Sequence, residues 1–219
     1  MKILVSGSLA FDKIMDFPGR FAEHILPDKI HTLSVSFEIN NLQENFGGTA
    51  GNIAYNLSML GERPTILSSV GNDFEAYRSW LTERNVDLSY VKVVNEERTA
   101  FVNIITDQAD NQIAAFYPGA MKHSCEAEPE AQAEQTLAII APGSAPDMVR
   151  LAKYYQEQNI PFIFDPGQQI PVLSADDLRV SSKGAKMLVS NDYELSLIMK
   201  KTGWSEEKIL ENAEILVTT

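Results

Sequence analysis

The sequence predicts an α/β protein in which helices cover both faces of a doubly wound, mostly parallel sheet, with a small antiparallel β-sheet forming a separate lid. Short, continuously apolar runs that end at Gly or Pro recur along the chain, as in strands buried on both faces. Amphipathic helical patterns lie between these runs, and a strand, helix, strand series implies parallel pairing. A few other segments alternate between apolar and polar residues, which is typical of a sheet with one wet face.

The first elements follow this scheme closely. Residues 2–8 (KILVSGS) form an apolar run closed by glycine, so we expect the first buried strand there. Residues 49–60 carry Ile53 and Leu57 at helical spacing, and Gly61 ends the predicted helix.

The same alternation continues to the end of the chain. The predicted strands are residues 65–71, 137–142, 161–166, 186–191 and 214–219, and the predicted helices are residues 74–84, 146–157, 175–181 and 192–200. We therefore expect one α/β domain over residues 1–219.

The lid is predicted from alternating segments. Residues 31–37 (HTLSVSF) place apolar side chains at every second position, and residues 99–105 and 112–117 show a similar mixed pattern. We expect the lid to be formed by segments at about 12–46 and 98–118.

Composition and charge narrow the classes of function. The chain has 219 residues, 44% of them hydrophobic, with 18 Lys and Arg against 30 Asp and Glu, giving a net charge of −12. Such an acidic protein is not expected to bind nucleic acid or anionic membranes broadly. No run approaches the roughly 20 apolar residues that span a bilayer. The single cysteine, Cys125, excludes an internal disulfide and fits a reducing compartment, so we expect a cytoplasmic protein.

The strongest local motif is FGGTAGN, at the start of the helix predicted from residue 49. Gly47 and Gly48 allow the backbone to approach a ligand closely, and the helix N-terminus offers N–H groups and a positive dipole end. Asn52 is placed to hydrogen-bond a hydroxyl group. The alternative is a structural glycine turn in which Thr49 caps the helix. The motif is neither a Walker loop nor a GxGxxG fingerprint.

Asp12 follows the first predicted strand. Ligands of open parallel sheets bind beyond the carboxyl ends of the strands, so a carboxylate there is placed to bind hydroxyl groups. A turn-forming role is the alternative.

Together these features resemble the ribokinase-like (PfkB) family of sugar and nucleoside kinases. The segments that carry the resemblance are Asp12, GGTAGN at 47–52, Ala54, Gly61, VGND at 70–73, FDPGQQ at 164–169 and NDYE at 191–194. The long segments at 24–37 and 99–121 look most like the adenosine-kinase type found in prokaryotes.

The resemblance implies transfer of the ATP γ-phosphoryl group to a hydroxyl of a nucleoside, with adenosine as the model acceptor. It assigns hydroxyl binding to Asp12, Gly47, Gly48 and Asn52. Phe37, Phe101 and Phe116 are candidates for stacking on a base, with packing inside the lid as the alternative.

The resemblance also implies ATP and Mg²⁺ as cofactors. Asn191 and Glu194 match the family's NxxE motif, which helps to place the magnesium ion, through water, and the phosphates. This fits Mg²⁺, which keeps several waters and uses few protein carboxylates. The same two residues also suit a helix N-terminus with Asn191 as the cap.

Other readings remain open at this point. The acceptor is a bare sugar in the ribokinase and fructokinase branches, and a non-catalytic nucleoside- or sugar-binding protein is a further alternative. The family's DTxGAGD-like segment, with its catalytic-base Asp, does not occur before Thr219. We therefore expect a truncated chain that is nearly inactive alone, and the exposed lid edge suggests a homodimer.

Overall fold

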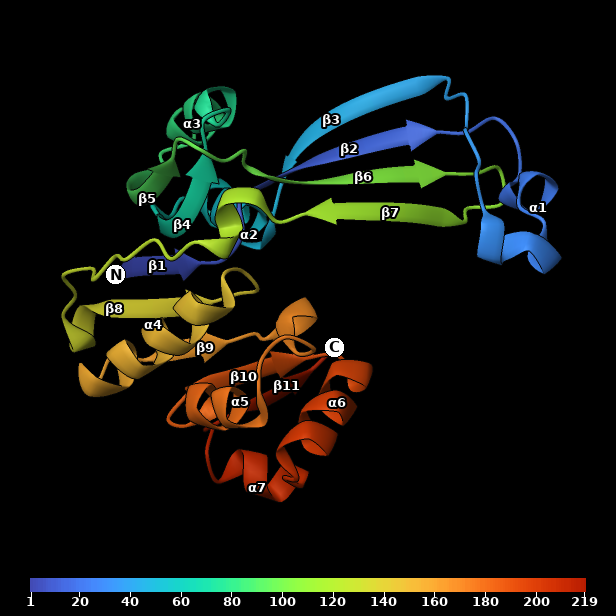
Figure 1. Cartoon of the computed structure of the whole chain (residues 1–219). Coiled ribbons are helices and arrows are strands. Elements are labelled where there is room, and N and C mark those ends of the chain that lie inside the picture. Colours follow the sequence, from blue (N-terminus) through green and yellow to red (C-terminus); the bar gives the residue numbers. More distant parts are fainter.

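The computed structural model describes all 219 residues and places them in a main sheet and a smaller sheet that projects from it (Figure 1). The main sheet has seven strands, in the spatial order β11 (Leu216–Thr218), β10 (Met187–Ser190), β9 (Phe162–Phe164), β8 (Thr136–Ile140), β1 (Lys2–Ser6), β4 (Thr65–Gly71) and β5 (Asp87–Val94). Every neighbouring pair is parallel. The predicted doubly wound parallel sheet is confirmed.

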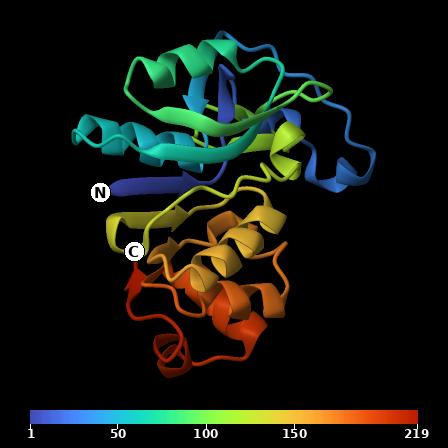
Figure 2. The same ribbon diagram turned by 90° about the vertical axis from the view of Figure 1, so that its left-hand side faces the viewer.

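Helices cover both faces of this sheet. They are α2 (Thr49–Met59), α3 (Glu75–Thr82), α4 (Ala145–Glu157), α5 (Ala175–Ser182), α6 (Asp192–Thr202) and α7 (Glu206–Leu210). Alternate residues of β1 belong to different cores: Leu4 packs with α4 and α5, whereas Ile3 and Val5 pack with α2 and α3. Figure 2 shows the two halves of the chain stacked on either side of β1 and β8. None of the helices is long and apolar enough to cross a membrane.

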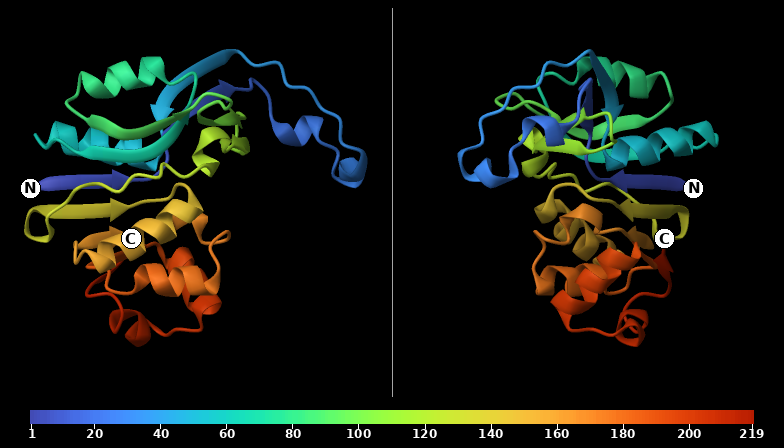
Figure 3. Two further views of the ribbon diagram at one scale, coloured as in Figure 1. Left: turned by 60° about the vertical axis from the view of Figure 1, so that its left-hand side comes forward. Right: turned by 90° about the vertical axis from the view of Figure 1, so that its right-hand side faces the viewer.

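The smaller sheet, called the lid from here on, has four strands. Their spatial order is β3 (Asn41–Gly47), β2 (Ala10–Asp16), β6 (Ala100–Thr106) and β7 (Gln112–Tyr117). Figure 3 shows the lid from two further sides as an arm that leaves the body, with α1 (Phe21–His24) and a 3₁₀ turn (Pro27–Thr32) at its far end.

The lid is a mixed sheet and not the purely antiparallel one expected. The β2–β6 pair is parallel, while β2–β3 and β6–β7 are antiparallel. The reason is topological: β2 follows β1 and β6 follows β5, and both enter the lid from the same carboxyl edge of the main sheet. The two strands therefore run in the same direction.

The prediction of a strand at residues 31–37 is wrong. This segment holds the end of the 3₁₀ turn and an irregular stretch, and Leu33 and Val35 are exposed. Strands β2, β3 and β5 were not predicted as separate strands. β3 (NLQENFG) is mostly polar, and neither β2 (AFDKIMD) nor β5 (DLSYVKVV) is a continuous apolar run or a strict alternation. Alternation in a short segment is therefore a weak signal without a partner strand.

Aromatic side chains form a small core at the far end of the lid. Phe37 packs against Phe17 and Phe21 with ring centroids 4.9 and 5.0 Å apart. The buried carboxylate of Asp107 accepts hydrogen bonds from the backbone N–H groups of Phe21 (2.9 Å) and Asn111 (2.9 Å). These contacts hold α1 and the β6–β7 turn together.

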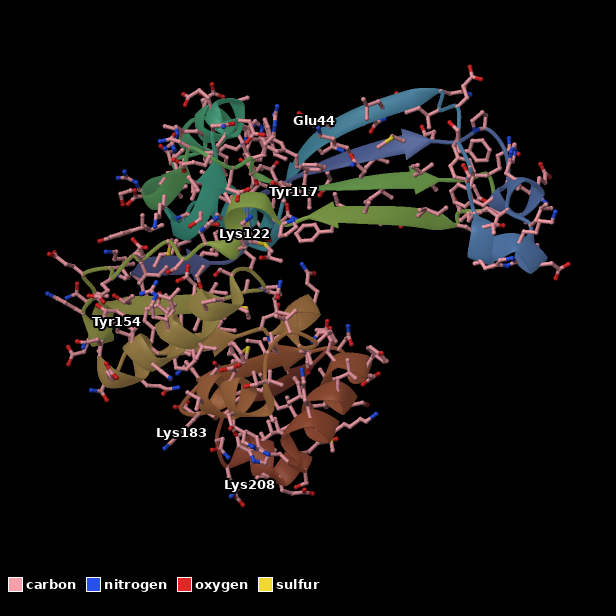
Figure 4. The ribbon with its side chains drawn as sticks, in the orientation of Figure 1. Glu44, Tyr117, Lys122, Tyr154, Lys183 and Lys208 are labelled. Carbon is pink, nitrogen blue, oxygen red and sulfur yellow. The ribbon has the colours of Figure 1, made fainter.

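The root of the lid is held by a cluster around Glu97. Its carboxylate accepts a hydrogen bond from the Tyr117 hydroxyl (3.0 Å) and forms an ion pair with Lys122 (2.5 Å). Figure 4 shows Tyr117 and Lys122 together where β7 returns to the body. The backbone N–H of Ala120 donates to the carbonyl of Arg98 (2.8 Å), which ties the segments that enter β6 and leave β7.

Candidate functional site

A network of hydrogen bonds between three segments of the chain fixes the glycine-rich turn. The Ser8 hydroxyl accepts from the N–H of Thr49 (2.9 Å), and the Thr49 hydroxyl donates to the carbonyl of Pro142 (2.5 Å). The N–H of Ala50 donates to the carbonyl of Ser8 (3.0 Å). These bonds join the ends of β1 and β8 to the start of α2.

The hydrogen bonds of this turn differ from two expectations. Thr49 is the first residue of α2 and not its cap, since the capping position is Gly48, with φ +89°. A side chain at Gly48 would collide with the carbonyl of Ser8, so glycine is required there. The N–H groups of Thr49 and Ala50 already bond Ser8. The N-terminus of α2 therefore does not offer these two donors to an anion.

Asp12 lies on β2, within the lid and not in a loop after β1. Its carboxylate packs against the backbone of Gly47 on the adjacent strand, and a Cβ on Gly47 would overlap Oδ2 of Asp12. Burial raises the pKa of Asp12. The structure thus brings the early aspartate and the first glycine of the motif into contact.

The side chain of Tyr77 also contacts Gly47. Its hydroxyl donates to the carbonyl of Gly47 (2.9 Å), and a side chain at Gly51 would overlap this hydroxyl. Burial, and then the charge of Asp12, raise the pKa of Tyr77. Tyr77 therefore remains protonated and holds Gly47 beside Asp12.

The register of the lid strands decides which side chains share the face of Asp12. One cross-strand row contains Asn45, Asp12, Val102 and Phe116, because these residues pair in succession across the four strands. Paired residues point to the same face of a sheet, and neighbours along a strand point to opposite faces. Phe101 pairs with Phe11 and Tyr117 and so lies on the opposite face from Asp12.

A cavity of about 600 Å³ opens beside this row. It is lined by Phe116, Pro118, Met121, Lys122, Gly143, Ser144, Ala145, Pro146, Gln168, Gln169 and Val172. These residues come from the end of β7 and from the loops that follow β8 and β9. The cavity thus lies at the carboxyl edge of the main sheet, where ligands of such folds bind.

Asp165 and Glu194 form a second group of polar residues at this edge. Asp165 follows β9, and its pKa is raised to about 6 by burial and by the charge of Glu194, against the effect of the Gly167 N–H. Asn191 and Glu194 form a capping box at the start of α6, with N–H to oxygen distances of 2.9 and 2.8 Å. Two neighbouring carboxyl groups without a cationic partner suit a hydrated divalent cation.

The structure does not bring every predicted residue to one place. Asn52 is exposed on α2 and its side chain forms no hydrogen bond in the chain. Phe37 belongs to the aromatic core at the lid tip. It packs against Phe17, five residues beyond Asp12 and therefore roughly 17 Å away along an extended strand. Phe101 packs against Tyr117 (5.1 Å) on the far face of the lid.

Sequence reasoning missed several residues that build the site, namely Ser8, Tyr77, Met121, Pro142 and Ser144. One signal was available for the last two. The segment APGSAP at 141–146 directly follows a predicted strand, and it joins the other loops at the carboxyl edge. Nothing in the sequence indicates that Tyr77 reaches Gly47, because that contact depends on how α3 packs.

Comparison with known proteins agrees with this architecture. The family model of the pfkB family carbohydrate kinases matches residues 10–219. The chain belongs to this family. The resemblance stated from Asp12 and the GGTAGN motif is thereby confirmed.

Individual pfkB relatives are named nucleoside kinases. The chain is 30% identical over 203 residues to a nucleoside kinase of Methanothermobacter thermautotrophicus, covering 91% of this chain and 62% of that protein. It is 29% identical over 194 residues to one of Methanocaldococcus jannaschii, covering 88% and 64%. The chain thus spans somewhat less than two thirds of the length of these relatives.

Solved structures of pfkB relatives superpose on the whole chain. The nucleoside kinase of Burkholderia thailandensis in complex with inosine has a TM-score of 0.81 and 37% identity, with 99% of this chain and 69% of that chain covered. The nucleoside kinase of M. jannaschii, described as an archaeal member of the ribokinase family, has a TM-score of 0.86 and 27% identity, with 100% and 70% covered.

Proposed function

We propose that this pfkB chain is the acceptor-binding part of an ATP-dependent nucleoside kinase, with a purine nucleoside such as adenosine as the acceptor. The observation that carries the proposal is the lid row that places the carboxylate of Asp12 and the ring of Phe116 on one face. The relatives named nucleoside kinases support the same class of acceptor.

Asp12 is the residue we assign to the ribose. When ionised, its carboxylate only accepts hydrogen bonds, and two neighbouring hydroxyl groups of a ribose supply two donors. The contact with Gly47 holds the carboxylate in place before the acceptor binds. This preorganisation favours binding because less freedom is lost in the complex.

The cavity beside Phe116 is the place we assign to the base. Strands β2 and β7 are separated by one strand, so Asp12 and Phe116 lie roughly 10 Å apart across the lid. Phe116 is 52% exposed and borders the cavity together with Met121 and Pro146. An exposed aromatic ring on an apolar wall suits a planar base, and a bare sugar would leave this wall uncovered.

Asn191, Glu194 and Asp165 are the residues we assign to the phosphate side. Glu194 and Asp165 would hold Mg²⁺ through water, and Asn191 would keep Glu194 in its orientation through the capping box. When bound, Mg²⁺ neutralises charge on the phosphates of ATP. Phe37, Phe101 and Asn52 take no part in acceptor binding in this proposal.

The face of the lid opposite Asp12 is the surface we assign to a second copy of the chain. A row of apolar residues crosses it, formed by Leu42, Met15, Ile105 and Ile113, and Leu42 is 59% exposed. In a two-fold dimer the same surface of both copies forms the interface, so this apolar row would pack against the same row of the second copy. Sedimentation of the protein and of Leu42→Glu tests this, and a monomeric wild-type protein would contradict it.

Binding calorimetry with adenosine and with ribose tests the assignment of the acceptor. We expect adenosine to bind much more tightly than ribose, because ribose leaves the base cavity unfilled. Asp12→Asn should weaken adenosine binding by roughly 5- to 150-fold, which corresponds to about 1–3 kcal/mol for an unpaired buried group. Asp16→Asn is the matched control on the same strand. Equal affinities for adenosine and ribose would contradict the nucleoside assignment and favour a sugar kinase.

A further inference from the structure

A second, much smaller cavity lies between the main sheet and the start of α4. Its volume is about 10 Å³, and its wall includes Ser6 and Gly7 at the end of β1, Ser68 and Ser69 of β4, and Ser144 before α4. It is distinct from the 600 Å³ cavity, although Met121, Gly143 and Ser144 border both.

Two hydroxyl groups in this wall have no hydrogen-bond partner in the protein. They are Oγ of Ser69, a residue that is 3% exposed, and Oγ of Ser144, and both atoms are buried. The other two serines of the wall are paired, since Ser6 donates to Ile139 (3.3 Å) and Ser68 donates to Gly7 (2.7 Å). The two residues that carry the unpaired hydroxyl groups therefore line the same small cavity.

The other α-helices that begin after a Ser or Asn, namely α5, α6 and α7, have a cap side chain that accepts a backbone N–H, whereas α4 does not. Ser144 and Asp147 have the spacing of a capping box, like Ser174 and Asp177 at the start of α5, where the box is complete. The Ser144 hydroxyl forms no cap bond.

Asp147 is engaged elsewhere. Its carboxylate accepts from the Ser124 hydroxyl (2.5 Å), from the N–H of Cys125 (2.8 Å) and from Arg150 (3.0 Å). The Asp147 side chain is thus drawn away from Ser144, which leaves the Ser144 hydroxyl at the cavity wall.

We propose that this cavity is a binding site for one water molecule, which bridges the hydroxyl groups of Ser69 and Ser144. Buried polar groups in folded proteins are nearly always hydrogen-bonded, to protein or to ordered water. A cavity needs roughly 10–15 Å³ to hold one water, and that water needs two or more polar partners. Both conditions are met here, and no larger ligand fits.

The bridge gives a partner to the hydroxyl group of Ser144, which makes no cap bond at the start of α4. It connects β4 to Ser144, and so anchors the Gly143–Ser144 loop that also borders the larger cavity. The site does not depend on the identity of the acceptor.

A crystal structure of the protein at high resolution tests the proposal directly. We expect one density peak within hydrogen-bonding distance of Oγ of both Ser69 and Ser144. Crystals soaked in rubidium chloride should show no anomalous signal at this position. A rubidium peak would identify a cation site instead, and serines that bond backbone atoms with no density between them would also refute the proposal.

A double-mutant cycle gives an independent test by thermal unfolding. Ser69→Ala and Ser144→Ala should each lower Tm by roughly 2–4 °C, because each leaves the other hydroxyl and the water with too few partners. The double variant should lose clearly less than the sum, since an apolar cavity wall has no unpaired group. Ser6→Ala is the matched control: its hydroxyl has a protein partner, so its shift should add to that of Ser144→Ala. Additive shifts for the Ser69 and Ser144 pair would contradict the bridge.

Discussion

The carboxylate of Asp12 rests directly on the backbone of Gly47, at a place where any larger residue would overlap it. The two residues are 35 positions apart in the sequence and are brought together by the antiparallel pairing of β2 with β3. The glycine therefore has a second role besides allowing a ligand to approach. It makes room for the side chain that we assign to the acceptor.

Gly47→Ala should displace the Asp12 carboxylate and weaken adenosine binding. We expect a loss of roughly 5- to 150-fold, similar to that of Asp12→Asn, because the same hydrogen bonds are lost. Calorimetry on Asp12→Asn, Gly47→Ala and the double variant measures this. The double variant should bind about as weakly as either single variant. Additive losses would show that Gly47 acts independently of Asp12.

Phe116→Ala and Phe101→Ala should have different effects, although both residues are aromatic and lie on neighbouring strands. Phe116→Ala should weaken adenosine binding by roughly 5- to 150-fold, the equivalent of about 1–3 kcal/mol of stacking, and leave ribose binding unchanged. Phe101→Ala should lower Tm with little effect on the ratio of the two affinities. The measurements are the affinities for adenosine and for ribose and the Tm of each variant. An equal loss of adenosine affinity in both variants would contradict the assignment of Phe116, and not Phe101, to the face of the lid that binds the base.

Lys201 should be required for the conformation of the segment that follows the β9 loop. Its ammonium group donates to the carbonyls of Ile170 (2.7 Å), Pro171 (2.9 Å) and Leu173 (2.5 Å), which uses all three of its donors. Lys201→Met should lower the free energy of unfolding by at least about 1.5 kcal/mol, the contribution of one hydrogen bond to a charged group.

Lys201→Arg should also lower the free energy of unfolding, although it keeps the positive charge. A planar guanidinium group cannot direct three donors to three carbonyls in the same way as the ammonium group. Lys200→Met is the matched control, because Lys200 is an exposed neighbour on the same helix. Chemical unfolding of the three variants provides the measurement. A loss for Lys200→Met as large as that for Lys201→Met would contradict the specific role of Lys201.

The tip of the lid should loosen at low pH because of Asp107. Burial would raise the pKa of this carboxyl, but N–H donation from Phe21, Asn111 and Ala109 outweighs burial and lowers the pKa to about 2. A lowered pKa in the folded state means that the carboxylate contributes its full stability above its ordinary pKa of 3.8. That contribution declines as the pH falls through that value toward 2.

NMR titration of the Phe21 and Asn111 amide protons provides the measurement. We expect a midpoint near pH 2 for both signals in the protein, and no such transition in Asp107→Asn. A midpoint close to 4 would show that the hydrogen bonds to Asp107 do not stabilise its charged form.

All strands of the main sheet except the edge strand β5 could be predicted from the sequence, because their signals are local. Strands such as β4 and β8 are continuous apolar runs, and the helices between them carry apolar residues at helical spacing. The strands of the lid were harder to predict from the sequence. β3 is almost entirely exposed and has only two large apolar side chains, so its strand character comes from pairing with β2 and not from its own composition.

The sequence by itself determined the fold class and the family, and it made Asp12 and the double glycine candidates for the acceptor site. Tertiary structure decided which aromatic residues share the face of Asp12, because a sheet alternates its side chains and the register between distant strands selects the face. It placed Phe37 at the lid tip and Phe116 at the cavity. It also left the hydroxyl groups of Ser69 and Ser144 together in one small cavity, which depends on where α4 packs against the sheet.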